Sequence, residues 1–103
     1  MTKKKWTFLS NHARIIAYIA EHPQTTTQFM ANKAGLSIRA VQTIFDDLEE
    51  EGYIIRERVG RCNHYKVNPD KPLRHRLEKH HRVGDVLTAL GIVQKKEDTK
   101  SKP

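Results

Sequence analysis

The side chains best suited to specific recognition chemistry are Arg39 and Gln42, which stand three residues apart. An arginine guanidinium can form two hydrogen bonds with the edge of a guanine, and a glutamine amide can do the same with an adenine. Residues three apart lie on one face of a helix, so a helix through this segment would present both groups together. Ser37 stands just before them, at the position where such a helix would begin, and the N-terminus of a helix is suited to bind a phosphate. These residue types at this spacing point to contacts with nucleic acid.

Other kinds of site have weaker signals. The chain has a single cysteine, Cys62, so an intramolecular disulfide is impossible, and a redox role would require neighbours that stabilise its thiolate. His75 and His80 are five residues apart, which is a poor helical spacing for joint metal ligation. Three histidines from distant segments could still converge in the fold, namely His12, His64 and His81. No nucleophile–base pair or glycine-rich phosphate loop stands out, so we expect no enzyme activity, no metal and no cofactor.

The charge of the chain agrees with a polyanionic partner. Its 103 residues are the size of one domain and carry a formal net charge of +7. A balance this basic favours nucleic acid or an anionic membrane surface, although it can also serve solubility alone. No apolar run approaches the ~18 residues of a membrane span, and the basic N-terminus is not followed by the apolar core of a signal peptide. We therefore expect a cytoplasmic location and no membrane partner.

Two helices are predicted in the N-terminal third of the chain. Ser10 is suited to cap the first helix, and Pro23 ends it because the residue before a proline avoids the helical region. The second helix begins at Thr25 or Thr26, since either threonine can act as its N-cap. It is expected to end at Gly35, a residue suited to a left-handed C-cap.

Residues 27–44 have the spacing of a helix-turn-helix. Ala31 is small enough for two helices to cross closely beside it, and Gly35 allows the turn because glycine tolerates a positive φ angle. Ser37 then caps a third helix, which we expect to end at Gly52. The apolar face of this helix is predicted to consist of Val41, Ile44, Phe45 and Leu48.

A β-hairpin is predicted after the third helix. Residues 54–59 and 62–67 read as strands on either side of Gly60-Arg61, which suits a tight turn. Pro69 then breaks the pattern. Three helices followed by a basic hairpin make a winged helix-turn-helix, so the predicted fold is mainly α with a small β-hairpin.

Roughly residues 10–67 resemble the winged-helix transcriptional regulators of bacteria and archaea, of the MarR and ArsR type. The sequence segments on which the resemblance rests are AGLSIRAVQTIFDDLEEEGYIIRERVGR and NHYKV. The resemblance implies a DNA-binding repressor or activator that is usually dimeric. The chain lacks the long N-terminal helices of the MarR type and the paired cysteines of the metal-sensing ArsR type, so the fold carries over better than any effector.

The resemblance implies that the third helix, about residues 37–51, lies in the major groove and that the hairpin, about residues 54–67, rests on the backbone or in the minor groove. Arg61 at the hairpin tip is then the best minor-groove candidate, and Arg56 is a further basic residue of the hairpin. The alternative is an edge hairpin whose charges only prevent aggregation. An acidic cluster at residues 46–51 is expected to be a solvated helix end. The residues expected to contact DNA are Thr26, Ser37, Arg39, Gln42, Thr43, Arg58, Arg61, Asn63 and His64.

A fourth helix is predicted over about residues 72–91, where apolar residues recur every three or four positions. This stripe is more apolar than a domain this small needs, so we expect it to form a homodimer, with the first helix and the segment around Trp6 and Phe8 contributing. The two aromatic residues are expected to pack against the helices. The predicted dimerisation residues are Leu73, Leu77, Val83, Val86, Leu87 and Leu90. The domain thus spans residues 1–93, and the polar residues 94–103 are expected to be disordered.

A winged helix can instead serve as a protein-interaction module within a larger assembly. A basic recognition face favours DNA, whereas an apolar or acidic face would favour a protein partner. Arg39, Arg58 and Arg61 make the predicted face basic. The sequence therefore predicts a sequence-specific transcriptional regulator that binds double-stranded DNA as a homodimer.

Overall fold

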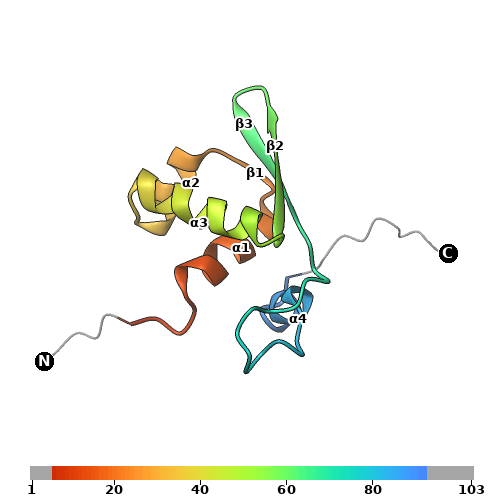
Figure 1. Ribbon diagram of the computed structural model, residues 1–103. Coiled ribbons are helices and arrows are strands. Elements are labelled where there is room, and N and C mark those ends of the chain that lie inside the picture. Colours follow the sequence, from red (N-terminus) through yellow and green to blue (C-terminus); the bar gives the residue numbers. More distant parts are fainter. Residues whose placement is uncertain (1–5, 93–103) are drawn as a thin grey trace, which may run out of the picture.

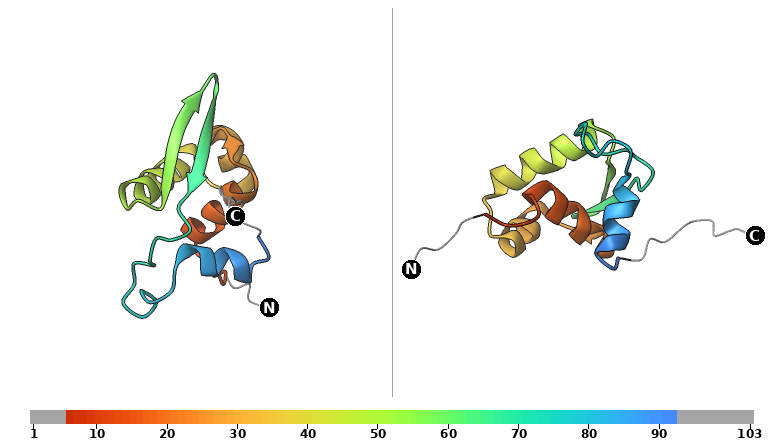
Figure 2. Two further views of the ribbon diagram at one scale, coloured as in Figure 1. Left: turned by 90° about the vertical axis from the view of Figure 1, so that its right-hand side faces the viewer. Right: turned by 90° about the horizontal axis from the view of Figure 1, so that it is seen from below.

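The computed structural model describes residues 6–92, which combine helices with a small antiparallel sheet (Figure 1). The predicted polar tail, residues 94–103, lies outside the described residues. The sheet has the strand order β1-β3-β2. The elements run in the order α1 (Asn11–Glu21), β1 (Gln24–Thr25), α2 (Thr27–Ala34), α3 (Ile38–Glu50), β2 (Ile54–Val59), β3 (Cys62–Val67) and α4 (Val83–Ala89). The β2–β3 hairpin rises at one end of the molecule, and α4 lies at the opposite end (Figures 1 and 2).

Local capping signals predicted the first three helices correctly. The side-chain oxygens of Ser10, Thr26 and Ser37 each accept a backbone N–H bond, of 3.1, 3.0 and 3.0 Å, at the starts of α1, α2 and α3. The cap of α2 is therefore Thr26 and not Thr25. Gly35 ends α2 with a φ angle of 70°, which confirms the predicted left-handed C-cap.

The predicted hairpin is also confirmed. β2 and β3 pair along their whole length, with Val59 opposite Cys62 beside the turn, where Gly60 has a φ angle of 63°. The sequence did not predict β1, which pairs with β3 and places Thr25 opposite Asn63. Thr25 is buried in this pairing, so it cannot also cap α2.

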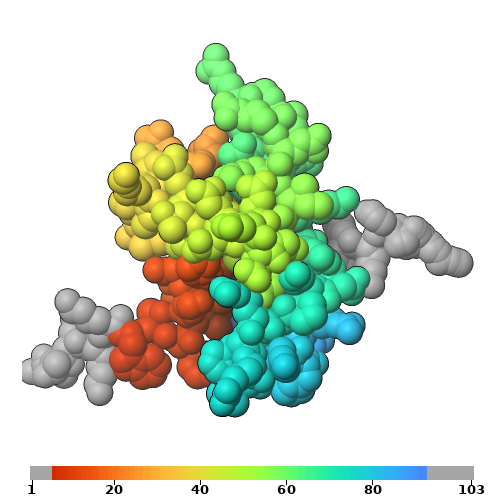
Figure 3. Space-filling view, in the orientation of Figure 1, coloured from red at the N-terminus to blue at the C-terminus, as the bar shows by residue number. Residues whose placement is uncertain are grey.

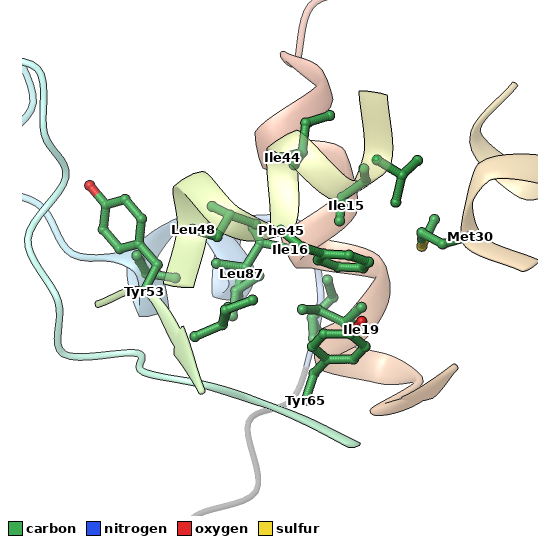
Figure 4. Close-up of a cluster of buried hydrophobic side chains, with 14 of the residues drawn as sticks. Ile15, Ile16, Ile19, Met30, Ile44, Phe45, Leu48, Tyr53, Tyr65 and Leu87 are labelled. Carbon is green, nitrogen blue, oxygen red and sulfur yellow. The ribbon is translucent and has the colours of Figure 1, made fainter. Parts of the chain in front are cut away.

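One hydrophobic core joins the helices to the sheet (Figure 4). Phe45 of α3 stacks on Tyr65 of β3, with 4.5 Å between the ring centroids. Ile15 and Ile19 of α1 are buried in the same cluster. The apolar face predicted for α3 is confirmed, because all four of its residues are buried. This packing turns the opposite, polar face of α3 outward.

The predicted fourth helix is mostly wrong. Only residues 83–89 are helical, and residues 72–82 form a loop whose ends meet in a β-bridge between Pro72 and Arg82. The N–H of Leu73 donates to the carbonyl of His81 over 3.0 Å, so the backbone bonds close the loop instead of a helix. The loop turns the chain back beneath the domain and lets α4 reach the core.

The predicted dimerisation stripe does not form along one edge. Val83 and Leu87 are buried in the core of the same chain, and Leu73 packs partly against it. Leu77 is 72% exposed on the loop. Val86 is half-buried and Leu90 is exposed at the end of α4. These apolar residues therefore belong to a loop and to a short helix that packs on the core, and not to one long apolar helix.

The expected packing of the N-terminal aromatic residues is wrong as well. Trp6 is 70% exposed and Phe8 is 92% exposed. The chain of residues 6–9 is ordered by a local bond, in which Thr7 Oγ1 donates to the carbonyl of Leu9 over 2.7 Å. Two large apolar side chains thus stand uncovered just before α1.

Candidate nucleic-acid interface

The turn between α2 and α3 sets the direction of α3. The N–H of Leu36 donates to the carbonyl of Ala31 over 3.0 Å and closes the turn around Gly35. Ala31 is buried on α2, which packs against α3. These contacts agree with the helix-turn-helix spacing in the sequence, in which a small residue and a glycine allow two helices to approach closely.

The N-terminal half of α3 presents polar side chains to solvent. Arg39, Gln42 and Thr43 are exposed, whereas Val41 and Ile44 are buried. The three exposed residues occupy positions i, i+3 and i+4, so they share one face of the helix. A guanidinium and an amide suited to base edges therefore stand together on the surface, beside the exposed helix cap.

The hairpin of β2 and β3 projects from the domain as a wing (Figure 3). Arg61 is exposed at the turn, beside Gly60. Nε of Arg58 donates to the carbonyl of Gly60 over 3.0 Å, so the Arg58 guanidinium lies at the tip as well. Two arginine side chains at the end of a thin hairpin suit contact with phosphates or with a narrow minor groove.

Three other predicted contact residues have mixed roles. The Thr26 hydroxyl is the cap of α2, and the residue is half-buried. Nδ2 of Asn63 donates to Oη of Tyr65 over 3.1 Å, so this amide is partly used within the domain. His64 is exposed on the central strand of the sheet. Of these three, only His64 is exposed.

Arg56 supports the wing and is not one of its exposed basic groups. Its Nη2 atom lies 3.1 Å from Oδ1 of Asp46 and 2.8 Å from Oε1 of Glu49, both on α3. Its guanidinium carbon is 5.9 Å from the centroid of the Phe45 ring. Burial alone would lower the pKa of Arg56, but the hydrogen bonds to the two carboxylates outweigh it and raise the pKa above its usual value.

The acidic end of α3 is largely exposed, as predicted, but the sequence did not predict that several of its carboxylates pair with basic residues of other elements. Asp47 Oδ2 lies 2.9 Å from Nε2 of His12 on α1. Glu51 Oε1 lies 3.5 Å from Nε of Arg74 in the loop after the sheet. Positions 46, 47, 49 and 51 thus each face a basic residue from another element. The alternation of Ile54 and Arg56 on β2 was the sequence signal for one of these contacts, because both residues lie on the face that meets α3.

Within residues 6–92 the structure has no group of three or more histidine, cysteine or acidic residues arranged to hold a metal ion. The helices of that part of the chain include none with the length and apolar character needed to cross a bilayer.

The helix-turn-helix that carries the polar face of α3 lies in a segment that matches a known protein family, whereas the tip of the wing lies beyond that segment. No curated protein matches the chain. Residues 10–55, from the cap of α1 to the start of β2, match a protein family described as winged helix-turn-helix DNA-binding. The match is to a DNA-binding domain and not to a catalytic one, and it does not distinguish the MarR and ArsR types. In both fold and sequence, this segment is similar to winged helix-turn-helix DNA-binding domains.

Proposed function

We propose that the protein is a cytoplasmic regulator of transcription that binds double-stranded DNA sequence-specifically as a homodimer. In this proposal α3 enters the major groove, with Arg39 and Gln42 on base edges. The wing rests on the backbone or in the minor groove, with Arg58 and Arg61 as its anchors. Ser37 and the N-terminus of α3 meet a phosphate.

The observation that carries the proposal is the shared exposure of Arg39, Gln42 and Thr43 on α3, within the segment that matches DNA-binding domains. The buried face of the same helix leaves these side chains with no role in the core. The acidic residues lie at the opposite end of α3, where Arg56 and other basic groups partly neutralise them. The resemblance to MarR- and ArsR-type regulators supports transcription control as the purpose of binding.

A homodimer would present two recognition helices to one face of DNA. In such an arrangement the two copies of α3 stand about one helical turn apart, ~34 Å, and the binding site is a near-palindrome. The wing lies at the end of the molecule opposite α4 (Figures 1 and 2). A two-fold axis near α4 would therefore leave both wings at the outer ends of the complex.

Selection of bound fragments from a random double-stranded DNA library tests this function. We expect enrichment of a near-palindrome, and we expect Arg39→Ala to weaken binding by about 1–3 kcal/mol and to relax the preference at one base position of each half-site. Arg76→Ala is the matched control, because Arg76 is an exposed arginine in the loop of residues 72–82 and belongs neither to the N-terminal half of α3 nor to the wing. A library that shows no enrichment would favour a protein-interaction module instead. Equal losses for the two variants would contradict the placement of α3 in the groove.

A further inference from the structure

A groove of about 640 Å³ opens at the end of the molecule opposite the wing. It lies between α1, the C-terminal end of α3, the loop of residues 72–82 and α4. Its apolar lining includes Ile16, Leu48, Val86 and Leu87. Two ion pairs, His12–Asp47 and Arg74–Glu51, stand among the lining residues and add polar groups to it. An apolar lining with a few polar groups is the usual composition of a protein contact site.

An aromatic arm, defined here as Trp6, Thr7 and Phe8, begins at the edge of this groove. Phe8 is among the groove residues, yet it is 92% exposed, and Trp6 is 70% exposed. The base of the arm is held in place, because Nη2 of Arg14 donates to the carbonyl of Leu9 over 3.2 Å. The arm therefore projects from a fixed point while its two rings leave the adjacent groove open.

We propose that the aromatic arm of one copy inserts into the groove of a second copy, and that two reciprocally exchanged arms form the homodimer. This inference rests on the homodimer in the proposed function and does not depend on DNA. Arm and groove lie at the same end of the molecule, as a two-fold interface requires, because each copy must supply both halves of the contact.

The area available matches a stable dimer. A buried Trp or Phe side chain removes about 150–250 Å² from water, so the four rings of two arms contribute roughly 600–1,000 Å². The groove walls that cover them lose a smaller area, which brings the total to roughly 1,000 Å² or slightly more, the size that a specific protein interface should reach. Leu77, exposed on the loop beside the groove, adds apolar surface at the edge.

Trp6 is the only tryptophan in the chain, so its fluorescence reports directly on the arm. The test is a dilution series of the full chain without DNA, followed by sedimentation and by Trp6 emission. We expect a dimer at micromolar concentration whose emission lies to the blue, and a shift of the emission to the red as dilution yields monomers.

Two variants and one control locate the contact. Phe8→Asp removes one of the two rings of the arm, and Val86→Arg fills the groove. Each should weaken the dimer by roughly 100-fold or more, since each change occurs twice per dimer. Phe29→Asp is the matched control, because Phe29 is an exposed ring on α2, and it should leave the dimer intact. A mixture of the two variants should recover part of the dimer, because the intact arm of one fits the intact groove of the other.

Four results would overturn the exchange of arms. The first two are a chain that is monomeric at all concentrations and a Phe8→Asp variant that dimerises like the native chain. The other two are a dimer whose Trp6 emission does not shift to the red on dilution, and a monomer whose Trp6 emission is already blue. The last result would mean that the arm folds into its own groove. Because Phe8 is exposed, its substitution tests the contact without disturbing the fold, even if Val86→Arg unfolds the chain. DNA selection is a separate measurement, so failure here and failure of DNA binding remain distinguishable.

Discussion

Nη2 of Arg56 lies 3.1 Å from Oδ1 of Asp46, so an ion pair joins the first strand of the wing to α3. The same nitrogen lies 2.8 Å from Oε1 of Glu49. The arginine side chain is mostly covered, whereas both carboxylates are more exposed. The base of the wing and the candidate recognition helix are therefore held at a fixed angle by a charged contact as well as by the core.

A double-mutant cycle on Arg56 and Asp46 should measure this tie. We expect the changes Arg56→Gln and Asp46→Asn to be coupled by about 0.5–1 kcal/mol in the free energy of unfolding, because exposed ion pairs contribute little and this pair is only partly covered. Urea unfolding of the four proteins gives the coupling. Arg58→Gln with Asp46→Asn is the control cycle, because Arg58 bonds to the wing tip instead. If both cycles give the same coupling, the contact does not hold the wing to α3.

Affinity for DNA should depend steeply on salt. Each phosphate contact releases counterions, so the logarithm of the binding constant falls linearly with the logarithm of salt concentration, with a slope of about −0.9 per contact. Arg61→Ala should reduce this slope by about 0.9 for each half-site. Arg76→Ala, at the far end of the domain, should leave the slope unchanged. Fluorescence anisotropy between ~50 and ~200 mM salt measures both, and a slope that Arg61 does not affect would remove the wing tip from the interface.

The sequence predicted those elements whose signals are local. Ser10 and Ser37 cap the helices that they precede, and Gly60 marks the turn of the hairpin, because each acts on neighbours within a few residues. The strand β1 has two residues, too few for any periodicity, and it exists only because β3 offers it a partner.

The prediction of a helix over residues 72–91 was wrong for a different reason. A three-to-four spacing shows which residues could share a helical face, but not whether that face meets a neighbour. Val83 and Leu87 meet the core, whereas Leu77 meets solvent. The side chains on α3 that are expected to contact DNA were predicted from residue type and helical position. The same reasoning missed the ion pairs of Arg56 with Asp46 and Glu49, because this pairing depends on how the wing folds against the helix.

The hydroxyl of Tyr53 should make stability depend on alkaline pH. It donates to the carbonyl of Pro72 over 3.2 Å, and burial, reinforced by the Glu51 carboxylate, raises the pKa of this phenol. A raised pKa means that the folded chain holds the phenol proton more tightly than the unfolded chain. This contribution to stability is complete below the unfolded pKa of about 10 and is lost as the pH rises through the folded pKa.

Tyr53→Phe isolates the effect. Below about pH 9 the native chain should exceed the variant by about 0.5–1.5 kcal/mol in the free energy of unfolding, from the hydrogen bond. Above about pH 10 that difference should shrink, because deprotonation removes the donor. Urea unfolding of both chains across this range provides the comparison, and a difference that stays constant to about pH 11 would rule out the shift.

Gly84 provides a test in which helix propensity and packing disagree. It is the second residue of α4, and its N–H donates to the carbonyl of Pro69 over 2.8 Å. An added Cβ atom would lie 3.0 Å from that oxygen and 3.2 Å from Cβ of Pro69. Propensity alone predicts that Gly84→Ala stabilises the helix by up to about 1 kcal/mol. The close approach of the Pro69 backbone predicts the opposite sign.

We expect Gly84→Ala to lower the free energy of unfolding by about 1 kcal/mol, since overpacking against backbone usually costs 1–3 kcal/mol, roughly, and the gain in propensity offsets only part of it. Thr88→Ala is the control, because Thr88 is exposed on the same helix and its change should be neutral or slightly stabilising. Denaturant unfolding of the two variants decides the sign. A Gly84→Ala chain more stable than the native one would mean that α4 can move away from Pro69, and then the wall of the groove that α4 forms would not be fixed by this contact.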